Sequence, residues 1–203
     1  MPATINFRTA QFLISAPTLA QCPPESGVEV AFAGRSNAGK SSAINTLTNN
    51  GKLARTSKTP GRTQLINQFR LKIKGVDHGL VIDLPGYGYA KVPEKIRSGW
   101  QQMIEGYLLD REELVMVFVL VDGEIGPTKL DLQMLEWLRH HEVDHCVVAT
   151  KADRVKATKR ADRQAEVSTA CMLEPADVLW VSATKGTGIE TLRSRVTDLL
   201  TVH

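Results

Sequence analysis

The chain has 203 residues, of which 42% are hydrophobic and 23% are charged. This length and composition predict one folded domain and exclude a disordered or collagen-like chain. The longest apolar run, residues 114–121, falls short of the roughly 20 residues needed to span a bilayer, and the N-terminus shows no secretory signal. Three widely spaced cysteines, Cys22, Cys146 and Cys171, predict reduced thiols. We therefore expect a cytoplasmic protein with no membrane partner.

The net charge of +3 conceals an uneven distribution of charged residues. Residues 30–76 contain nine Lys or Arg and no Asp or Glu, and residues 151–163 contain six cations against Asp153 and Asp162. Such basic stretches favour a polyanionic partner, either nucleotide phosphate or nucleic acid. On charge alone, a solvated basic face explains them equally well.

The first half of the chain predicts a short series of elements. Pro17, Pro23 and Pro24 prevent a helix through residues 1–27, which we expect to form an irregular segment packed on the domain. A strand over 28–34, a helix over 40–47 and a polar loop over 51–62 follow. Residues 65–74 alternate apolar and polar side chains, which predicts a strand with one wet face at the edge of a sheet.

Strands and helices continue to alternate to the end of the chain. Apolar runs predict strands over 80–82, 114–121, 146–149 and 178–181, and apolar spacing predicts helices over 130–138 and 192–200. Alternation of this kind predicts a three-layer α/β fold in which residues 28–203 form one domain. We expect a mostly parallel six-stranded sheet with one antiparallel edge strand and helices on both faces. Ligands of such sheets bind at the carboxyl ends of the strands.

The first motif at such a strand end is Gly-x4-Gly-Lys-Ser, followed directly by the helix over 40–47. Its glycines let backbone N–H groups curl around phosphate oxygens, and the helix N-terminus adds positive charge. Lys40 would reach the β- and γ-phosphates and the Ser41 hydroxyl would bind Mg²⁺. The predicted phosphate-binding residues are Gly34, Arg35, Ser36, Asn37, Ala38, Gly39, Lys40, Ser41 and Ser42.

A second motif, Asp83-Leu84-Pro85-Gly86, follows the strand over 80–82. The Asp83 carboxylate can hold Mg²⁺ through a water, and the Gly86 N–H can contact the γ-phosphate. In the polar loop, Thr63 can close on Mg²⁺ and the γ-phosphate together with Gly61 and Arg62. The predicted metal ligands are Ser41, Thr63 and Asp83, and the predicted catalytic groups are Lys40, Thr63 and Gly86.

Two further motifs predict the choice of base. In Thr150-Lys151-Ala152-Asp153, the Asp153 carboxylate can accept two hydrogen bonds from the N–H groups of guanine, a pair that adenine lacks. Lys151 would pack its stem over the ring. Ser182, Ala183 and Thr184 follow the last strand, where a backbone N–H can meet the guanine carbonyl. A polar turn and a helix cap are the alternative interpretations of these short motifs.

The motifs from Gly34 to Gly188, about three-quarters of the chain, resemble those of translation-factor-class P-loop GTPases. Four segments of the sequence resemble the EngB (YihA/YsxC) family of bacterial GTPases in particular. They are Gly-Arg-Ser-Asn-Ala-Gly-Lys-Ser-Ser, Lys-Thr-Pro-Gly-Arg-Thr-Gln, Asp-Leu-Pro-Gly-Tyr-Gly-Tyr-Ala and Thr-Lys-Ala-Asp. The resemblance implies a P-loop GTPase fold, a monomer that binds GTP, GDP and Mg²⁺, and a role in assembly of the large ribosomal subunit. Its partners would be precursor rRNA and ribosomal proteins. It also implies a need for the protein in normal cell division and septation.

Three positions bear on the activity that the resemblance implies. Thr150 stands where many GTPases have Asn, which removes an amide that would brace the phosphate loop. Tyr87 stands where some GTPases have a water-orienting Gln, so we expect slow GTP hydrolysis, with Arg55 and Arg62 as candidate arginine fingers. Asn37 could hold a potassium ion against the phosphates, as in related GTPases.

Three functions remain open from the sequence. The first is a slow GTPase whose GTP form docks on pre-ribosomal RNA and whose hydrolysis releases it. The second is a GTP-dependent module that binds a protein partner, for example in division, without an RNA role. The third, a nucleoside kinase or ATPase, is disfavoured by Thr150 and Asp153.

Overall fold

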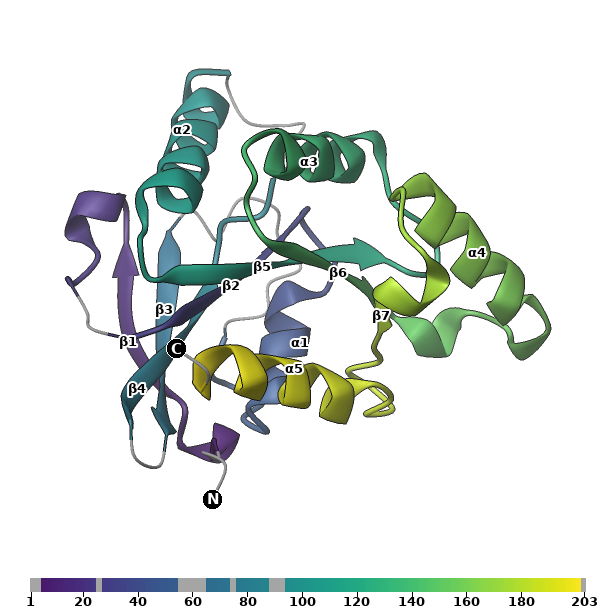
Figure 1. Cartoon of the computed structure of the whole chain (residues 1–203), viewed down its shortest axis with the longest axis horizontal. Coiled ribbons are helices and arrows are strands. Elements are labelled where there is room, and N and C mark those ends of the chain that lie inside the picture. Colours follow the sequence, from purple (N-terminus) through teal and green to yellow (C-terminus); the bar gives the residue numbers. More distant parts are fainter. Residues whose placement is uncertain (1–4, 25–26, 55–64, 74–75, 88–93, 202–203) are drawn as a thin grey trace.

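A seven-stranded sheet runs through the protein, in strand order β1-β3-β4-β2-β5-β6-β7. The computed structural model describes residues 5–24, 27–54, 65–73, 76–87 and 94–201 (Figure 1). Its strands are β1 (Gln11–Ala16), β2 (Glu29–Gly34), β3 (Ile66–Ile73), β4 (Val76–Asp83), β5 (Leu114–Asp122), β6 (His145–Thr150) and β7 (Leu179–Trp180). Strands β4, β2, β5, β6 and β7 pair in parallel, whereas β3 is antiparallel to both of its neighbours.

Helices cover both faces of the sheet. They are α1 (Lys40–Leu47), α2 (Glu94–Asp110), α3 (Lys129–His140), α4 (Arg160–Ala170) and α5 (Ile189–Thr201). Figure 1 shows α1 and α5 on one face and α2 and α3 on the other. Strand β5 contributes to both core clusters: Phe118 and Leu120 pack with α1 and α5, and Val119 packs with α2 and α3. The predicted three-layer α/β fold with a mostly parallel sheet is confirmed.

The N-terminal segment differs from its prediction. Residues 11–16 are not irregular but form β1, which pairs with β3 from Gln11 opposite Arg70 to Ala16 opposite Ile66. The sheet therefore has seven strands rather than the six expected. The prolines that exclude a helix all follow β1, so they leave its apolar Phe-Leu-Ile run free to pair as a strand.

The wet face predicted for residues 65–74 is also wrong at Gln68, which is fully buried. Strand β3 is not the edge of the sheet, because β1 flanks it. On the side of β3 that Gln68 shares, Ile66 packs in one core cluster with Ile104 and Tyr107 of α2. Helix α2 thus covers this face at Gln68, whereas Arg70 is half-buried and Lys72 is exposed.

A buried ion pair fixes the end of α2 to the sheet. Glu29, at the start of β2, is fully buried and receives two hydrogen bonds from Arg111, at 2.7 Å from Nη2 and 3.1 Å from Nε. The Tyr107 hydroxyl of α2 donates to the same carboxylate. Arg111 also donates to the Pro23 carbonyl at 3.2 Å, which ties the N-terminal segment to this point.

Breaking this pair should destabilise the fold strongly. Arg111→Met leaves the Glu29 carboxylate buried without its cation, so we expect the free energy of unfolding to fall by about 3–5 kcal/mol in denaturant titration. The control is Arg154→Met, which removes an exposed ion pair with Glu124 and should change it by at most about 1 kcal/mol. Equal losses in the two variants would contradict this account.

Candidate functional site

The phosphate loop, residues 34–41, connects the carboxyl end of β2 to α1. At Gly34 a Cβ atom would lie 2.8 Å from the Leu120 carbonyl oxygen of β5, so only glycine fits without displacing the backbone. At Gly39, φ is +99°, a conformation that side chains disfavour, and the residue leads directly into α1. The loop therefore presents its backbone, followed by a helix N-terminus, to any bound anion.

Lys40 and Asp83 face each other in the buried floor of the site. Lys40 is only 9% exposed, and its Nζ donates to the Gly34 carbonyl at 3.4 Å. Burial lowers the pKa of Lys40 and raises the pKa of Asp83, and the opposite charge of each works against these shifts in the other. A hydrogen bond with Ser41 also lowers the pKa of Asp83. The floor of the site thus places one buried cationic side chain opposite one buried carboxylate.

The same residues fit a divalent cation. The Oδ1 atom of Asp83 is buried and has no hydrogen-bond partner among the described residues, and the Ser41 hydroxyl lies beside the carboxylate. Carboxylate and hydroxyl oxygens suit Mg²⁺, which keeps several waters in its shell. The third predicted ligand, Thr63, lies outside the described residues together with Gly61, Arg62 and Arg55.

Thr150 supports the phosphate loop, contrary to the expectation that losing an Asn amide removes this brace. Its hydroxyl lies 2.6 Å from the Ala38 carbonyl oxygen and 3.1 Å from that of Val121, and the residue is 4% exposed. A hydroxyl has one hydrogen to donate, and the shorter contact favours Ala38 as its acceptor. Thr150 thus replaces the amide with a shorter side chain that reaches the loop from the end of β6.

The predicted base-binding residues also come together. Asp153 accepts a hydrogen bond from the Ser182 hydroxyl at 2.5 Å, and the Thr184 hydroxyl lies 3.4 Å from its other oxygen. The Ser182 bond is the main reason why the pKa of Asp153 lies below its ordinary value. Asp153 is therefore an exposed carboxylate whose orientation is fixed by Ser182 and Thr184. Such a group can accept paired N–H donors from a base.

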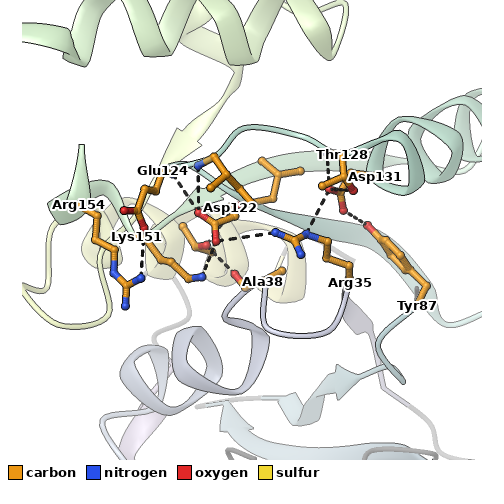
Figure 2. A network of polar contacts seen from close by, with 12 residues as sticks. Arg35, Ala38, Tyr87, Asp122, Glu124, Thr128, Asp131, Lys151 and Arg154 are labelled. Carbon is orange, nitrogen blue, oxygen red and sulfur yellow. Dashed lines mark hydrogen bonds and ion pairs between the residues drawn. The ribbon is translucent and has the colours of Figure 1, made fainter. Parts of the chain in front are cut away.

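Lys151 forms an ion pair with Asp122, a residue that the sequence analysis did not single out. Its ammonium pairs with Asp122, the last residue of β5, which is 4% exposed. The other oxygen of Asp122 accepts the Glu124 N–H at 3.0 Å. Figure 2 shows Asp122 between Lys151 on one side and Arg35 on the other.

Arg35 and Tyr87 direct their side chains to acidic residues. The guanidinium of Arg35 lies 4.0 Å from Asp122 and 3.8 Å from Asp131, so its positive charge lies near two acidic residues. The Tyr87 hydroxyl donates to Asp131 at 2.9 Å (Figure 2). Burial and then the negative charge of Asp131 raise the pKa of Tyr87 well above its ordinary value, so its hydroxyl stays protonated.

The described motifs gather at one edge of the sheet. The phosphate loop, the Asp83–Gly86 turn, Thr150–Asp153 and Ser182–Thr184 all follow strands of one sheet at their carboxyl ends. Asn37 adopts a left-handed backbone (φ 66°) with an exposed side chain, and its potassium site stays a prediction. Among the described residues, no group of three or more His, Cys, Asp or Glu could hold a metal, and no helix is long and apolar enough to cross a membrane.

Comparisons with known proteins agree with this geometry. Residues 29–151 match a family model described as "50S ribosome-binding GTPase". A relative from Nitrosococcus oceani, described as "Probable GTP-binding protein EngB", is 45% identical over 196 residues, covering 96% of each chain. One from Sodalis glossinidius with the same description is 43% identical over 201 residues, covering 98% of this chain and 93% of the relative. A crystal structure described as a probable GTP-binding protein engB has a TM-score of 0.67 at 24% identity, covering 85% of this chain and 98% of that one.

The fold and this site define a P-loop GTPase. Because the match to its relatives runs over nearly the whole length at more than 40% identity, the chain belongs to the EngB family of GTP-binding proteins.

Removing the Thr150 hydroxyl should weaken nucleotide binding. Thr150→Val keeps the shape but leaves the Ala38 carbonyl without its donor, at a cost of about 1–2 kcal/mol. We expect GDP to bind about 5- to 30-fold more weakly in calorimetry. Thr150→Ser, which keeps the hydroxyl, should recover most of the affinity, and unchanged binding by Thr150→Val would show that this contact does not brace the loop.

Proposed function

We propose that the protein is an Mg²⁺-dependent GTP/GDP switch with slow intrinsic GTP hydrolysis. The observation that carries this proposal is the pairing of two sites at one sheet edge. Lys40, Ser41 and Asp83 can receive phosphates and a cation, and the braced Asp153 carboxylate can receive guanine. Ser41 and Asp83 would hold Mg²⁺, which would supply positive charge to neutralise the phosphates. The chain itself would bind and orient the phosphates through residues 34–41 and Lys40.

The position of Tyr87 supports a slow rate. A residue directly after Gly86 could orient an attacking water only if its polar end faced the γ-phosphate. The Tyr87 hydroxyl instead donates to the buried carboxylate of Asp131 in α3. Catalysis would then depend on Lys40, Thr63 and the Gly86 N–H, and we propose that a potassium ion at Asn37 adds transition-state charge stabilisation. Equal turnover in potassium and in sodium at the same ionic strength would contradict the potassium contribution.

Guanine selectivity should depend on the Asp153 carboxylate. In Asp153→Asn the side chain offers one acceptor and one N–H₂ donor, so it no longer matches the two N–H donors of guanine. We expect GDP affinity to fall about 100-fold. Xanthosine diphosphate, which has a carbonyl in place of the 2-amino group, should bind the variant better than the wild type. A variant that still prefers GDP would contradict this assignment of the base.

We further propose that this switch serves assembly of the large ribosomal subunit and normal cell division. The matching family model is described as a 50S ribosome-binding GTPase, and residues 30–76 carry nine cations and no acid. Among the described cations of this stretch, Lys52 and Lys72 are exposed and would favour contact with rRNA phosphates. The protein would act as a cytoplasmic monomer whose GTP form docks on the precursor particle and whose GDP form leaves it. The three cysteines are free thiols, in keeping with a reducing compartment.

Sedimentation with purified large ribosomal subunits tests this role. We expect the protein to sediment with the particles when loaded with a non-hydrolysable GTP analogue and to stay in the supernatant with GDP. The bound fraction should fall steeply as salt rises. Absence of binding in both states, with nucleotide binding intact, would favour the alternative, a GTP-dependent module for a protein partner. Survival of the complex after RNA digestion would favour the same alternative.

A further inference from the structure

Tyr87 ties the turn after β4 to the phosphate loop through its backbone. The Tyr87 carbonyl oxygen accepts a hydrogen bond from the Ser36 N–H at 3.1 Å, and Tyr87 forms an isolated parallel bridge with Arg35. At the other end of the turn, Leu84 donates its N–H to the Phe32 carbonyl at 3.1 Å. The turn that contains Gly86 is therefore fastened at both ends to the strand and loop that would hold the phosphates.

The side chain of Tyr87 adds a third attachment, to Asp131 in the first turn of α3. Asp131 is fully buried, and its Oδ1 accepts the Tyr87 hydroxyl at 2.9 Å. Its Oδ2 accepts the N–H of Thr128 at 2.8 Å, which is one of the two bonds of a capping box, and also accepts the hydroxyl of Thr128 at 2.7 Å. Because the cap fixes the carboxylate, Tyr87 is bonded to a rigid helix end.

Asp131 also forms an ion pair with Arg35 of the phosphate loop. The Arg35 Nε atom lies 3.8 Å from Asp131 Oδ2, within an ion pair but without a hydrogen bond among the described residues. Figure 2 shows Tyr87 and Arg35 approaching Asp131 from different segments. One buried carboxylate thus contacts both parts of the chain that would surround the γ-phosphate.

We propose that Asp131 is a positioning residue for the γ-phosphate site: by binding the Tyr87 hydroxyl and facing Arg35, it holds the turn containing Gly86 against the phosphate loop. This inference rests on the proposed function. GTP and GDP differ by the γ-phosphate, which the Gly86 N–H would contact. A turn already held in place loses less conformational freedom when that contact forms. Loss of the attachment should therefore weaken GTP binding and leave GDP binding nearly unchanged.

The test compares Tyr87→Phe, Asp131→Ala and the double variant by calorimetry with GDP and with a non-hydrolysable GTP analogue. We expect each single variant to lose about 3- to 10-fold in affinity for the analogue and much less for GDP, because both remove the hydrogen bond from the Tyr87 hydroxyl to the Asp131 carboxylate. Since both changes remove the same bond, the double variant should be no weaker than Asp131→Ala alone.

The matched control is Thr128→Val, which removes the hydroxyl contact of the helix cap but keeps the bond between Tyr87 and Asp131. It should lower thermal stability and leave the ratio of the two affinities unchanged. Equal losses for GDP and the analogue, or additive losses in the double variant, would overturn the proposal. If Asp131→Ala does not fold, Tyr87→Phe with an unchanged ratio overturns it alone. A wild-type protein that binds neither nucleotide would instead refute the proposed function.

Discussion

Parallel pairing of β4, β2, β5 and β6 is the constraint on which the site depends. It places the carboxyl ends of these strands at one edge, and the functional segments are the loops that leave that edge. The phosphate loop follows β2, Asp83 ends β4, and Thr150 ends β6. Residues more than 100 positions apart therefore meet directly, as in the hydrogen bond between Thr150 and the Ala38 carbonyl. The hydrophobic layers on both faces of the sheet keep these ends in register.

The buried charged groups of the site that the structure describes lie near groups of opposite charge, since burying an unpaired charge would cost several kcal/mol. Lys40 and Asp83 oppose each other in the floor, and Asp122 pairs with Lys151. These partners belong to different segments, so the pairs also join segments to one another. The depressed pKa of Asp153 has a different cause, the Ser182 hydroxyl, since this carboxylate is exposed. The residues that would bind the phosphates and the cation, Lys40 and Asp83, are thus buried, whereas Asp153, which would bind the base, is exposed.

The sequence predicts those helices and strands that a local motif or an apolar run marks. Helix α1 begins and ends at the expected residues, and β5 was recognisable from its unbroken apolar run. The sequence does not predict β1, because Pro17, Pro23 and Pro24 exclude a helix but carry no information on a strand that ends before them. Helix α4 gave no signal, since Val167 and Ser168 are its only residues classed as buried. The bond from Asp131 to Tyr87 spans 44 positions, and the brace from Thr150 depends on where a short side chain reaches; neither follows from a motif.

The most direct test of this account is competition for a fluorescent GDP bound to the purified protein, in Mg²⁺ and in EDTA. The account predicts that GTP displaces the probe in Mg²⁺ and that ATP at about 100-fold excess does not. It also predicts that chelation of Mg²⁺ by EDTA lowers the affinity for GTP more than the affinity for GDP. The first outcome follows from the phosphate loop, the second from Asp153, and the third from the cation site at Ser41 and Asp83. Displacement by ATP as effective as by GTP, or binding of GTP that chelation leaves unchanged, would contradict the assignment of this site.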